Sequence, residues 1–339
     1  EWTLRNQLFY NRDWDKHQFS LMAGQQATSS TPVTTSGIYY GWDDQLQTSR
    51  PVDLAKLAAG INGAVAGSAD LPENNVGGGE GRIARTTSYY ANLGYTFDRK
   101  YTLNATWRID ESNLFGRDKS AQNRPVYSIG GKWALGTENF MKPINWLNRL
   151  DIRLTYGITG NAPFAGTAAS YDILSAQNDP NYVTGAGFIL SSPANTKLSW
   201  ESTRIYNAGI DFSIFKDRLS GSIDGYIKKT TDLIGALSTS PLTGYDNVIG
   251  NYGSMENKGI DIGLTSTNIL TRDFTWNSGF TFSYNKNKLT SLRENAPTTG
   301  EALVGTNRLV GYPLDASFVY NYGGLNSVGD PQIRRADGS

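Results

Sequence analysis

Residues 85–111 read RTTSYYANLGYTFDRKYTLNATWRIDE, and this stretch decides the fold class. Apolar and aromatic residues occupy most of its odd positions and polar or charged residues its even positions, on both sides of the triplet Asp98-Arg99-Lys100. A period of two places one kind of side chain on each face of a β-strand. The stretch therefore predicts an antiparallel hairpin of two amphipathic strands around a short turn.

The aromatic residues of this hairpin gather at both ends of its apolar face. Tyr95, Phe97 and Tyr101 lie near the turn, and Tyr89 and Trp107 lie toward the open end. Ten residues of a strand tilted by about 45° rise roughly 23 Å, close to the height of the apolar band of an outer-membrane barrel. Tyr and Trp prefer the two membrane interfaces, with aliphatic residues between them. We therefore expect the apolar face to contact lipid and the polar face to line a wet lumen.

Composition narrows the function classes. The 339 residues include 31 Lys plus Arg against 31 Asp plus Glu, so nothing favours nucleic acid as a partner. The chain has no cysteine, which excludes a disulfide scaffold and a thiolate metal site. No apolar run approaches the length of a transmembrane helix. The first residues do not resemble a signal peptide, so we expect any export signal to lie outside this sequence.

The same alternation recurs along the chain and predicts about ten strands in five hairpins. Short turns alternate with long connections, the pattern of outer-membrane barrels, whose long loops lie outside the cell and whose short turns lie in the periplasm. The alternating segments are Trp2–Tyr10, His17–Ala23, Tyr89–Phe97, Tyr101–Ile109, Tyr127–Leu135, Leu150–Ile158, Tyr206–Ile214, Leu219–Ile227, Ile260–Leu264 and Trp276–Tyr284.

The remaining segments are expected to be connections. Long loops are predicted from about Gln25 to Ala84 and from Ala162 to about Glu201, and a further loop of about twenty-five residues after Ile227. The chain from Asn285 onward is predicted to be mostly loop. One short helical segment is expected at Val52–Ala59, and a small helical turn is expected with Pro143 near its start.

Five long segments of the chain resemble the SusC/RagA-type TonB-dependent outer-membrane transporters. They contain nearly every predicted strand, and their order agrees with that family. The segments are SYYANLGYTFDRKYTLNATWRIDESNLFG (88–116), WALGTENFMKPINWLNRLDIRLTYGITGN (133–161), LSWESTRIYNAGIDFSIFKDRLSGSIDGYIKKTTDLI (198–234), GSMENKGIDIGLTSTN (253–268) and FTWNSGFTFSYNKNKL (274–289).

The resemblance implies an all-β fold, a transmembrane antiparallel β-barrel of which residues 1–339 form one segment of a larger barrel of about 22 strands. The family's N-terminal plug domain, its TonB-contacting box and its closing C-terminal strands are not visible in this sequence. The resemblance also implies a location in the outer membrane of a Gram-negative bacterium. The implied function is import of oligosaccharides or peptides, powered through TonB, with a SusD-like surface lipoprotein as a lid.

Catalytic and metal-binding chemistry has little basis in this sequence. The single histidine, His17, begins a predicted strand without neighbours at ligand spacing, so we interpret it as an interfacial strand residue. No nucleophile, paired-carboxylate or phosphate-loop motif is present, and the glycine cluster GGGEGR at residues 78–83 is interpreted as a flexible loop. We therefore expect neither an enzyme nor a bound cofactor or metal.

Aromatic residues in the predicted long loops are the candidate substrate contacts. Their rings have apolar faces and polar tips that suit sugars and peptide side chains, although such rings more often pack loops together. Polar residues on the inward face, such as Arg108, Asp110, Asp211 and Asp224, are expected to line the lumen. A non-transporting adhesin or a soluble carbohydrate-binding sandwich remains the alternative. The candidate contacts are Tyr39, Tyr40, Trp42, Tyr171, Tyr182 and Tyr245.

Overall fold

The computed structural model divides into two compact units, residues 1–4 with 27–86 and residues 5–26 with 87–339. The structure describes residues 1–31, 33–34, 42–49, 53, 56, 80–81, 83–114, 124–162, 171–177, 187–243, 247–293, 299–305 and 308–334.

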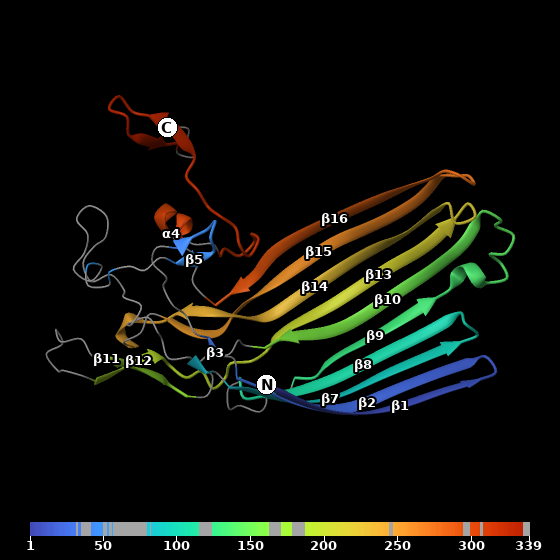
Figure 1. The fold of residues 1–339 in the computed structure, drawn as a ribbon. Helices are drawn as coiled ribbons and strands as arrows, with labels where there is room; N and C mark the ends of the chain where they lie inside the picture. The colour runs from blue at the N-terminus through green and yellow to red at the C-terminus, as the bar shows by residue number, and fades with distance from the viewer. Residues whose placement is uncertain are drawn as a thin grey trace. The chain divides into compact units, whose positions relative to one another are not determined.

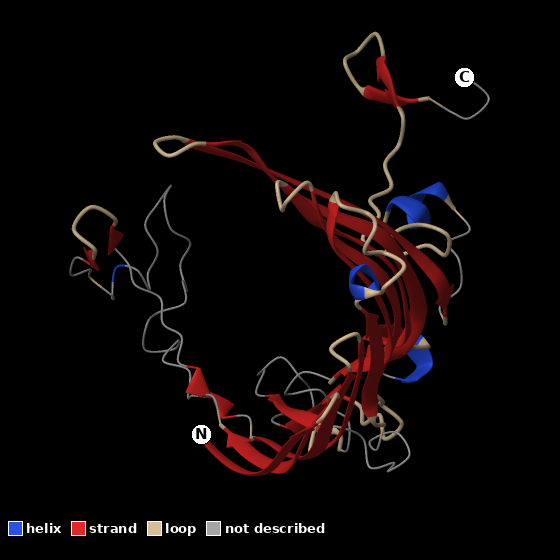
Figure 2. Ribbon diagram, turned by 90° about the vertical axis from the view of Figure 1, so that its right-hand side faces the viewer, coloured by secondary structure: helices blue, strands red, loops and turns tan. Residues whose placement is uncertain are grey.

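A ten-stranded antiparallel sheet dominates the described residues (Figure 1). Within this sheet the strands lie side by side in the order in which they occur along the chain. Ten strands in five hairpins were expected, so the all-β, antiparallel prediction is confirmed. Figure 2 shows that the sheet is curved, and its two edge strands, β1 and β16, are not paired with each other. The strands are β1 (Trp2–Trp14), β2 (His17–Ser30), β7 (Ala84–Phe97), β8 (Tyr101–Ser112), β9 (Val126–Trp133), β10 (Leu147–Asn161), β13 (Glu201–Ile214), β14 (Leu219–Ser238), β15 (Asn247–Leu270) and β16 (Thr275–Leu292).

The short turns lie at one end of the sheet, as their lengths predicted (Figure 1). Asp98 and Arg99 both have positive φ, +50° and +56°, the geometry of a tight hairpin turn that matches the twist of its strands. Neighbouring turns are joined by backbone hydrogen bonds, for example from the N–H of Asp98 to the carbonyl of Lys16 at 2.7 Å. In the same way, the N–H of Phe215 donates to the carbonyl of Trp146, also at 2.7 Å. The membrane side that these turns face stays a prediction.

The register keeps side chains of one kind together across the sheet. Ile210 lies opposite Ile152 on one side and Ile223 on the other. Asp211 lies opposite Asp151 and Ser222 on the other face. A slip of one residue would exchange the two faces, so the alternation itself fixes the register. We call these surfaces the apolar face and the polar face.

Two rows of aromatic rings limit the apolar face. In the turn-side aromatic row, consecutive ring centroids lie 5.0 to 6.4 Å apart. In the loop-side aromatic row, Tyr156 lies 6.2 Å from Tyr127 and 5.0 Å from Tyr206. We call the apolar face between these rows the apolar band; its large side chains are exposed, Leu154 by 61%. The turn-side row consists of Trp14, His17, Phe97, Tyr101 and Trp133.

Several strands are longer than the alternation predicted. The loop of about twenty-five residues expected after Ile227 is wrong, because β14 continues to Ser238 and β15 begins at Asn247. Both faces are polar over much of this part, so alternation ends while the backbone ladder continues. The ladder also shifts register near Leu233, where Asp232 has φ of +60°. Likewise β2 runs to Ser30, and β16 to Leu292, inside segments predicted as loop.

Helical structure is sparse among the described residues. A small helical turn was expected with Pro143 near its start, and Pro143 lies within consecutive turns that follow a 3₁₀-helix, η1 (Leu135–Thr137). One of these turns is closed by a hydrogen bond from the Ile144 N–H to the Met141 carbonyl at 3.0 Å. The helix α4 (Gly300–Val304), capped by the Thr299 hydroxyl, was not expected. The helix predicted at Val52–Ala59 lies outside the described residues except for Asp53 and Lys56. No helix in the described part of the chain is both long and apolar enough to cross a membrane.

Short strand pairs occupy some of the long connections. They contain two to six residues each and are separate from the main sheet. The pairs are β3 (Val33–Thr34) with β6 (Glu80–Gly81), β4 (Trp42–Asp43) with β5 (Thr48–Ser49), β11 (Ile173–Gln177) with β12 (Gly187–Ser192), and β17 (Tyr322–Leu325) with β18 (Pro331–Ile333).

Candidate functional site

The polar face carries an ion-pair network centred on Arg153, Asp211 and Asp224, which Arg149 joins through Asp211 at 4.0 Å. Arg153 on β10 donates from Nε to Asp211 Oδ2 at 2.8 Å and from Nη2 to Asp211 Oδ1 at 3.1 Å. Its Nη2 also contacts Asp224 Oδ2 at 3.0 Å. The backbone of Gly209 lies between these groups, and a Cβ there would lie 2.9 Å from the Arg153 guanidinium. The absence of a side chain at Gly209 therefore lets charged groups from three strands meet.

A second polar cluster lies toward the loop end of β7 and β8. Arg108 Nε donates to Asp110 Oδ1 at 2.8 Å, and its Nη2 donates to Ser88 Oγ at 2.9 Å. The Arg108 guanidinium carbon also lies 5.9 Å from the centroid of the Tyr90 ring. Arg108 and Asp110 were expected on the polar face, and the structure pairs them there.

Arg108 and Tyr90 border a hollow of about 430 Å³ on the sheet. Arg5 and Gln26 extend it across β1 and β2, where Arg5 Nε donates to Gln26 Oε1 at 3.0 Å. The Tyr90 hydroxyl is buried and has no hydrogen-bond partner among the described residues. Guanidinium, amide and phenol groups together suit a hydrated ligand rich in hydroxyl or peptide groups.

Sequence reasoning missed Arg5, Gln26 and Tyr90 as site residues. The strands of Arg5 and Tyr90 were predicted, whereas Gln26 lies in a segment that was predicted as loop. The position of these residues relative to one another depends on the register between β2 and β7, which residues 31–83 connect. The usable signal for Arg5 and Tyr90 was their parity, because each stands on the polar side of an alternating segment.

Two of the predicted loop aromatics, Trp42 and Tyr171, lie among the described residues. Trp42 and Tyr171 are exposed by 51% and 67%, and they belong to different compact units. Trp42 begins β4, and its Nε1 donates to Asp44 Oδ1 at 2.8 Å. Their role in substrate contact stays a prediction. The candidates Tyr39, Tyr40, Tyr182 and Tyr245 lie outside the described residues.

Beyond the loop-side aromatic row, β14 and β15 continue as what we call the loop-side extension, residues 228–238 and 247–257. Leu198 and Leu289 are fully buried against this part of the structure, and Leu233 is 3% exposed. Asn251 ties it together, since its Nδ2 donates to the carbonyls of Ser199 at 3.0 Å and Asp232 at 2.7 Å. The extension is therefore packed by its own side chains.

At the turn end of the sheet, Glu138 binds the polar groups of two residues of the turn-side aromatic row. Its carboxylate accepts hydrogen bonds from the Tyr101 hydroxyl at 2.6 Å, Trp133 Nε1 at 3.1 Å and Lys100 Nζ at 3.1 Å. These donors, the Tyr101 hydroxyl first, lower the pKa of Glu138 from 4.5 to about 2. The carboxylate thus stays ionised at the edge of the apolar band.

His17 lies in the same row rather than in a metal site. Its Nδ1 is 2.7 Å from the Tyr95 hydroxyl, and its ring stacks on Trp14 at 5.2 Å. Among the described residues, no group of three or more His, Asp or Glu side chains could hold a metal ion. The absence of a bound metal from the whole protein stays a prediction.

Comparison with known proteins places this sheet in a family. The family model described as "TonB dependent receptor-like, beta-barrel" matches residues 1–339. TonB-dependent receptor P39 of Formosa agariphila is 33% identical over 264 residues, which are 77% of this chain and 25% of that protein. TonB-dependent receptor SusC of Bacteroides thetaiotaomicron is 33% identical over 210 residues, 60% of this chain and 21% of that protein. The chain thus spans about a quarter of the length of these curated relatives.

Solved structures share the fold. The RagAB peptide importer in its open-open state superposes with a TM-score of 0.74 at 22% identity, covering 99% of this chain and 35% of that one. The closed-closed state gives 0.73 at 23% identity. Together with the family match over all 339 residues, this fold shows that the chain belongs to the TonB-dependent receptor β-barrel family.

Proposed function

We propose that this chain is part of an outer-membrane transporter that imports oligosaccharides or peptides with energy supplied through TonB. A SusD-like surface lipoprotein is the proposed partner on the loop side. The relatives' names support this class, since one is SusC and the structural neighbours are titled as a peptide importer. No enzymatic step is part of the proposal.

The observation that carries the proposal is the exposed apolar band between two aromatic rows, in a chain matched over its full length by the barrel family. Ile210 is 42% exposed and Leu154 is 61% exposed, which is unfavourable in water but favourable in lipid. A soluble carbohydrate-binding sandwich would instead cover such a face with a second sheet. Among the described residues, the other sheets have only two strands each.

The polar face is the proposed lumen wall. Its ion pairs and the hollow at Tyr90 and Arg108 provide hydrogen-bonding groups for a hydrated substrate. Residues 1–339 are proposed to form a middle segment of a barrel of about 22 strands, with the plug and the TonB contact contributed by other parts of the protein. The short turns are proposed to face the periplasm and the long connections the cell exterior.

Topology can be tested by cysteine labelling, because the chain itself contains no cysteine. Lys216→Cys lies in an exposed turn, and Gly187→Cys begins β12, where an added Cβ meets nothing within 4 Å. On intact cells, an impermeant thiol reagent should label Gly187→Cys and spare Lys216→Cys. Labelling of the turn position on intact cells would show that the proposed orientation is wrong.

Transport can be tested by deleting residues 32–79 from the complete protein. We expect the barrel to assemble and uptake or lid docking to be lost, because binding residues are usually carried on connections rather than on the scaffold. The control is the same uptake assay in cells that lack TonB. Unchanged uptake after deletion would remove the site candidates of this segment, and uptake independent of TonB would contradict the proposed function itself.

A further inference from the structure

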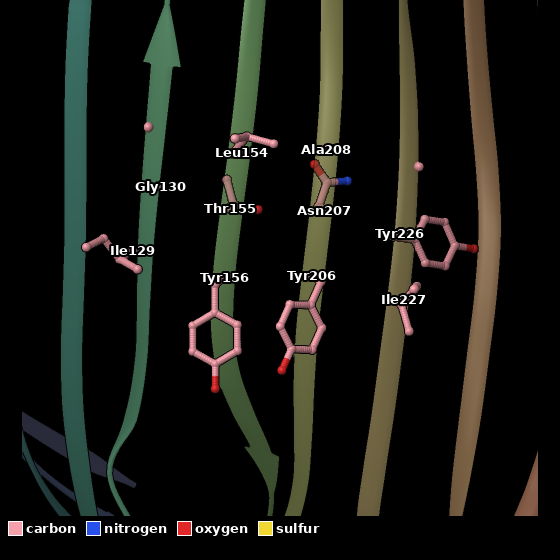
Figure 3. Close-up of a pocket in the computed structure, with 12 residues that line it drawn as sticks. Ile129, Gly130, Leu154, Thr155, Tyr156, Tyr206, Asn207, Ala208, Tyr226 and Ile227 are labelled. Atoms are coloured by element: carbon pink, nitrogen blue, oxygen red, sulfur yellow. The ribbon is translucent and has the colours of Figure 1, made fainter.

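The apolar face contains a hollow of about 680 Å³ across β9, β10, β13 and β14 (Figure 3). Three small residues, Gly131, Ala208 and Gly225, form its floor. Gly131 and Ala208 are the cross-strand partners of Leu154, and Gly225 is the partner of Ala208 on the next strand. Larger side chains border this floor: Ile129, Leu154, Tyr156, Tyr206 and Ile227.

The chain's own packing does not require glycine at this floor. A Cβ added at Gly131 or at Gly225 would meet no atom within 4 Å. By contrast, a Cβ at Gly209 on the polar face would contact Arg153 and Asp224. The hollow is therefore open space on an exposed surface, shaped to take an apolar group from outside the chain.

Polar groups border the loop-side end of the hollow. Tyr156 and Tyr206 have ring centroids 5.0 Å apart there. Arg204 lies two residues beyond Tyr206 on β13, and Lys229 lies two residues beyond Ile227 on β14, about 7 Å at the strand rise. Arg204 and Lys229 are opposite each other on the same face. Both cationic side chains are exposed. An apolar hollow thus ends at two aromatic hydroxyls and then at two cations.

These cations begin a row that crosses four strands. Lys229 lies opposite Glu256, Lys258 opposite Ile227 and Lys286, and Glu256 opposite Lys288. Glu256 contacts two of them, Lys258 Nζ at 2.8 Å and Lys229 Nζ at 3.8 Å. Arg204 and Lys286 form no ion pair with any described carboxylate. We call this row the cation strip: Arg204, Lys229, Lys258, Lys286 and Lys288.

The five cations of the strip have one carboxylate, Glu256, among them, so the strip carries an excess of positive charge. Lysines at a membrane boundary commonly extend toward water, which would leave the strip merely solvated. The strip lies directly beyond the apolar hollow, so one molecule with an apolar chain and an anionic group could contact both. Arginine and lysine next to each other suit a phosphate group, to which arginine donates paired hydrogen bonds.

We propose that the hollow and the cation strip form one binding site for a phosphate-bearing anionic lipid. An acyl chain lies over Gly131, Ala208 and Gly225, and the lipid phosphate contacts Arg204 and Lys229. The lipid belongs to the leaflet that meets the long connections. This inference rests on the proposed membrane location of the chain.

The experiment uses the complete protein in detergent, titrated with phosphatidylglycerol and followed by native mass spectrometry. Unaltered protein should retain one phosphatidylglycerol more tightly than phosphatidylcholine. Arg204→Gln with Lys229→Gln should weaken phosphatidylglycerol binding about tenfold or more, because each interfacial cation contributes strongly to anionic lipid binding. Gly131→Leu with Gly225→Leu should weaken it by filling the hollow. Inorganic phosphate should not displace the lipid.

The control variants make the same kinds of substitution outside the proposed lipid site. Lys216→Gln with Arg218→Gln removes two cations at the turn end, and Gly279→Leu fills open space on the polar face, where an added Cβ also meets nothing within 4 Å. Both should bind phosphatidylglycerol like the unaltered protein. Heat-modifiable gel mobility verifies assembly of each variant, and Arg204→Gln alone replaces the double variant if assembly fails.

Several outcomes would overturn the site. They are unchanged binding in the charge variant, unchanged binding in the filled variant, equal loss in the controls, or full displacement by inorganic phosphate. Recovery of the protein from cells without detergent would instead contradict the proposed function. A detergent-requiring protein whose variants all bind lipid equally would leave that function intact and remove only the lipid site.

Discussion

The apolar band and the loop-side extension share strands β14 and β15, yet their apolar side chains differ in exposure. In the band, Ile223 is 37% exposed and Ile210 is 42% exposed. In the extension, Leu233 is 3% exposed and Tyr252 is 4% exposed, close to the fully buried Leu198. Apolar side chains are therefore exposed in one region and buried in the other.

The difference identifies what stabilises each region. Exposed leucine and isoleucine gain nothing in water, so at the proposed membrane location the band is stabilised by the lipid around it. The extension buries its apolar side chains and bonds its buried Asn251 within the chain, so it depends on ordinary packing. Substitutions should consequently respond to lipid in the first region and not in the second.

The largest effect is expected for Leu198→Ala, which leaves a cavity where Leu198 is buried against the loop-side extension. A buried Leu to Ala change costs about 2–5 kcal/mol of unfolding free energy. Urea unfolding of the reconstituted protein measures it, and Leu154→Ala is the matched control, since lipid can fill the space left by that exposed side chain. Equal losses for the two variants would contradict the division into two regions.

Leu93→Arg is expected to come next. Leu93 stands at the middle of the apolar alternation of β7, where an arginine facing the bilayer midplane costs roughly 2–4 kcal/mol. Its neighbour Asn92 stands on the polar face, so Asn92→Arg should cost far less. Heat-modifiable mobility and unfolding in lipid compare the two, and similar costs would mean that the faces are assigned the wrong way.

The smallest effect is expected at Glu138, where the apolar band ends. Its pKa in the folded protein is about 2, below the ordinary 4.5, so its ionised form stabilises the folded state. That contribution is complete above about pH 4.5 and is lost as the pH falls toward 2. Glu138→Gln should remove this part of the pH dependence of Tm, and Tyr101→Phe should shift it to higher pH. An unchanged pH profile in Glu138→Gln would show that the carboxylate has no such role.

The sequence predicted the band better than the extension for a physical reason. Leu150–Ile158 was predicted as a strand and β10 spans Leu147–Asn161, because one face must be apolar wherever lipid surrounds the sheet. In the extension, water and packed side chains replace lipid, so alternation is no longer required. Strand pairing there depends on backbone bonds and on contacts distant in sequence, such as that between Asn251 and Ser199.

The candidate site was predicted only in part for the same reason. Arg108 and Asp110 were assigned to the polar face from parity alone, and they are paired there. Arg153 and Tyr90 require the register between strands, which no local pattern contains. The loop aromatics were chosen for their chemistry, and their role in substrate contact stays a prediction.

The neighbour-to-neighbour order of the strands also affects how freely the connections can change in length. Residues 31–83 join β2 to β7, whereas only residues 239–246 join β14 to β15, and both pairs are adjacent in the sheet. The entropy lost in closing a connection grows with the logarithm of its length, so this difference costs less than about 2 kcal/mol. Connections on the loop side can therefore lengthen or shorten at small thermodynamic cost while strand pairing is kept. Such a scaffold can acquire a new recognition surface without first acquiring a new fold.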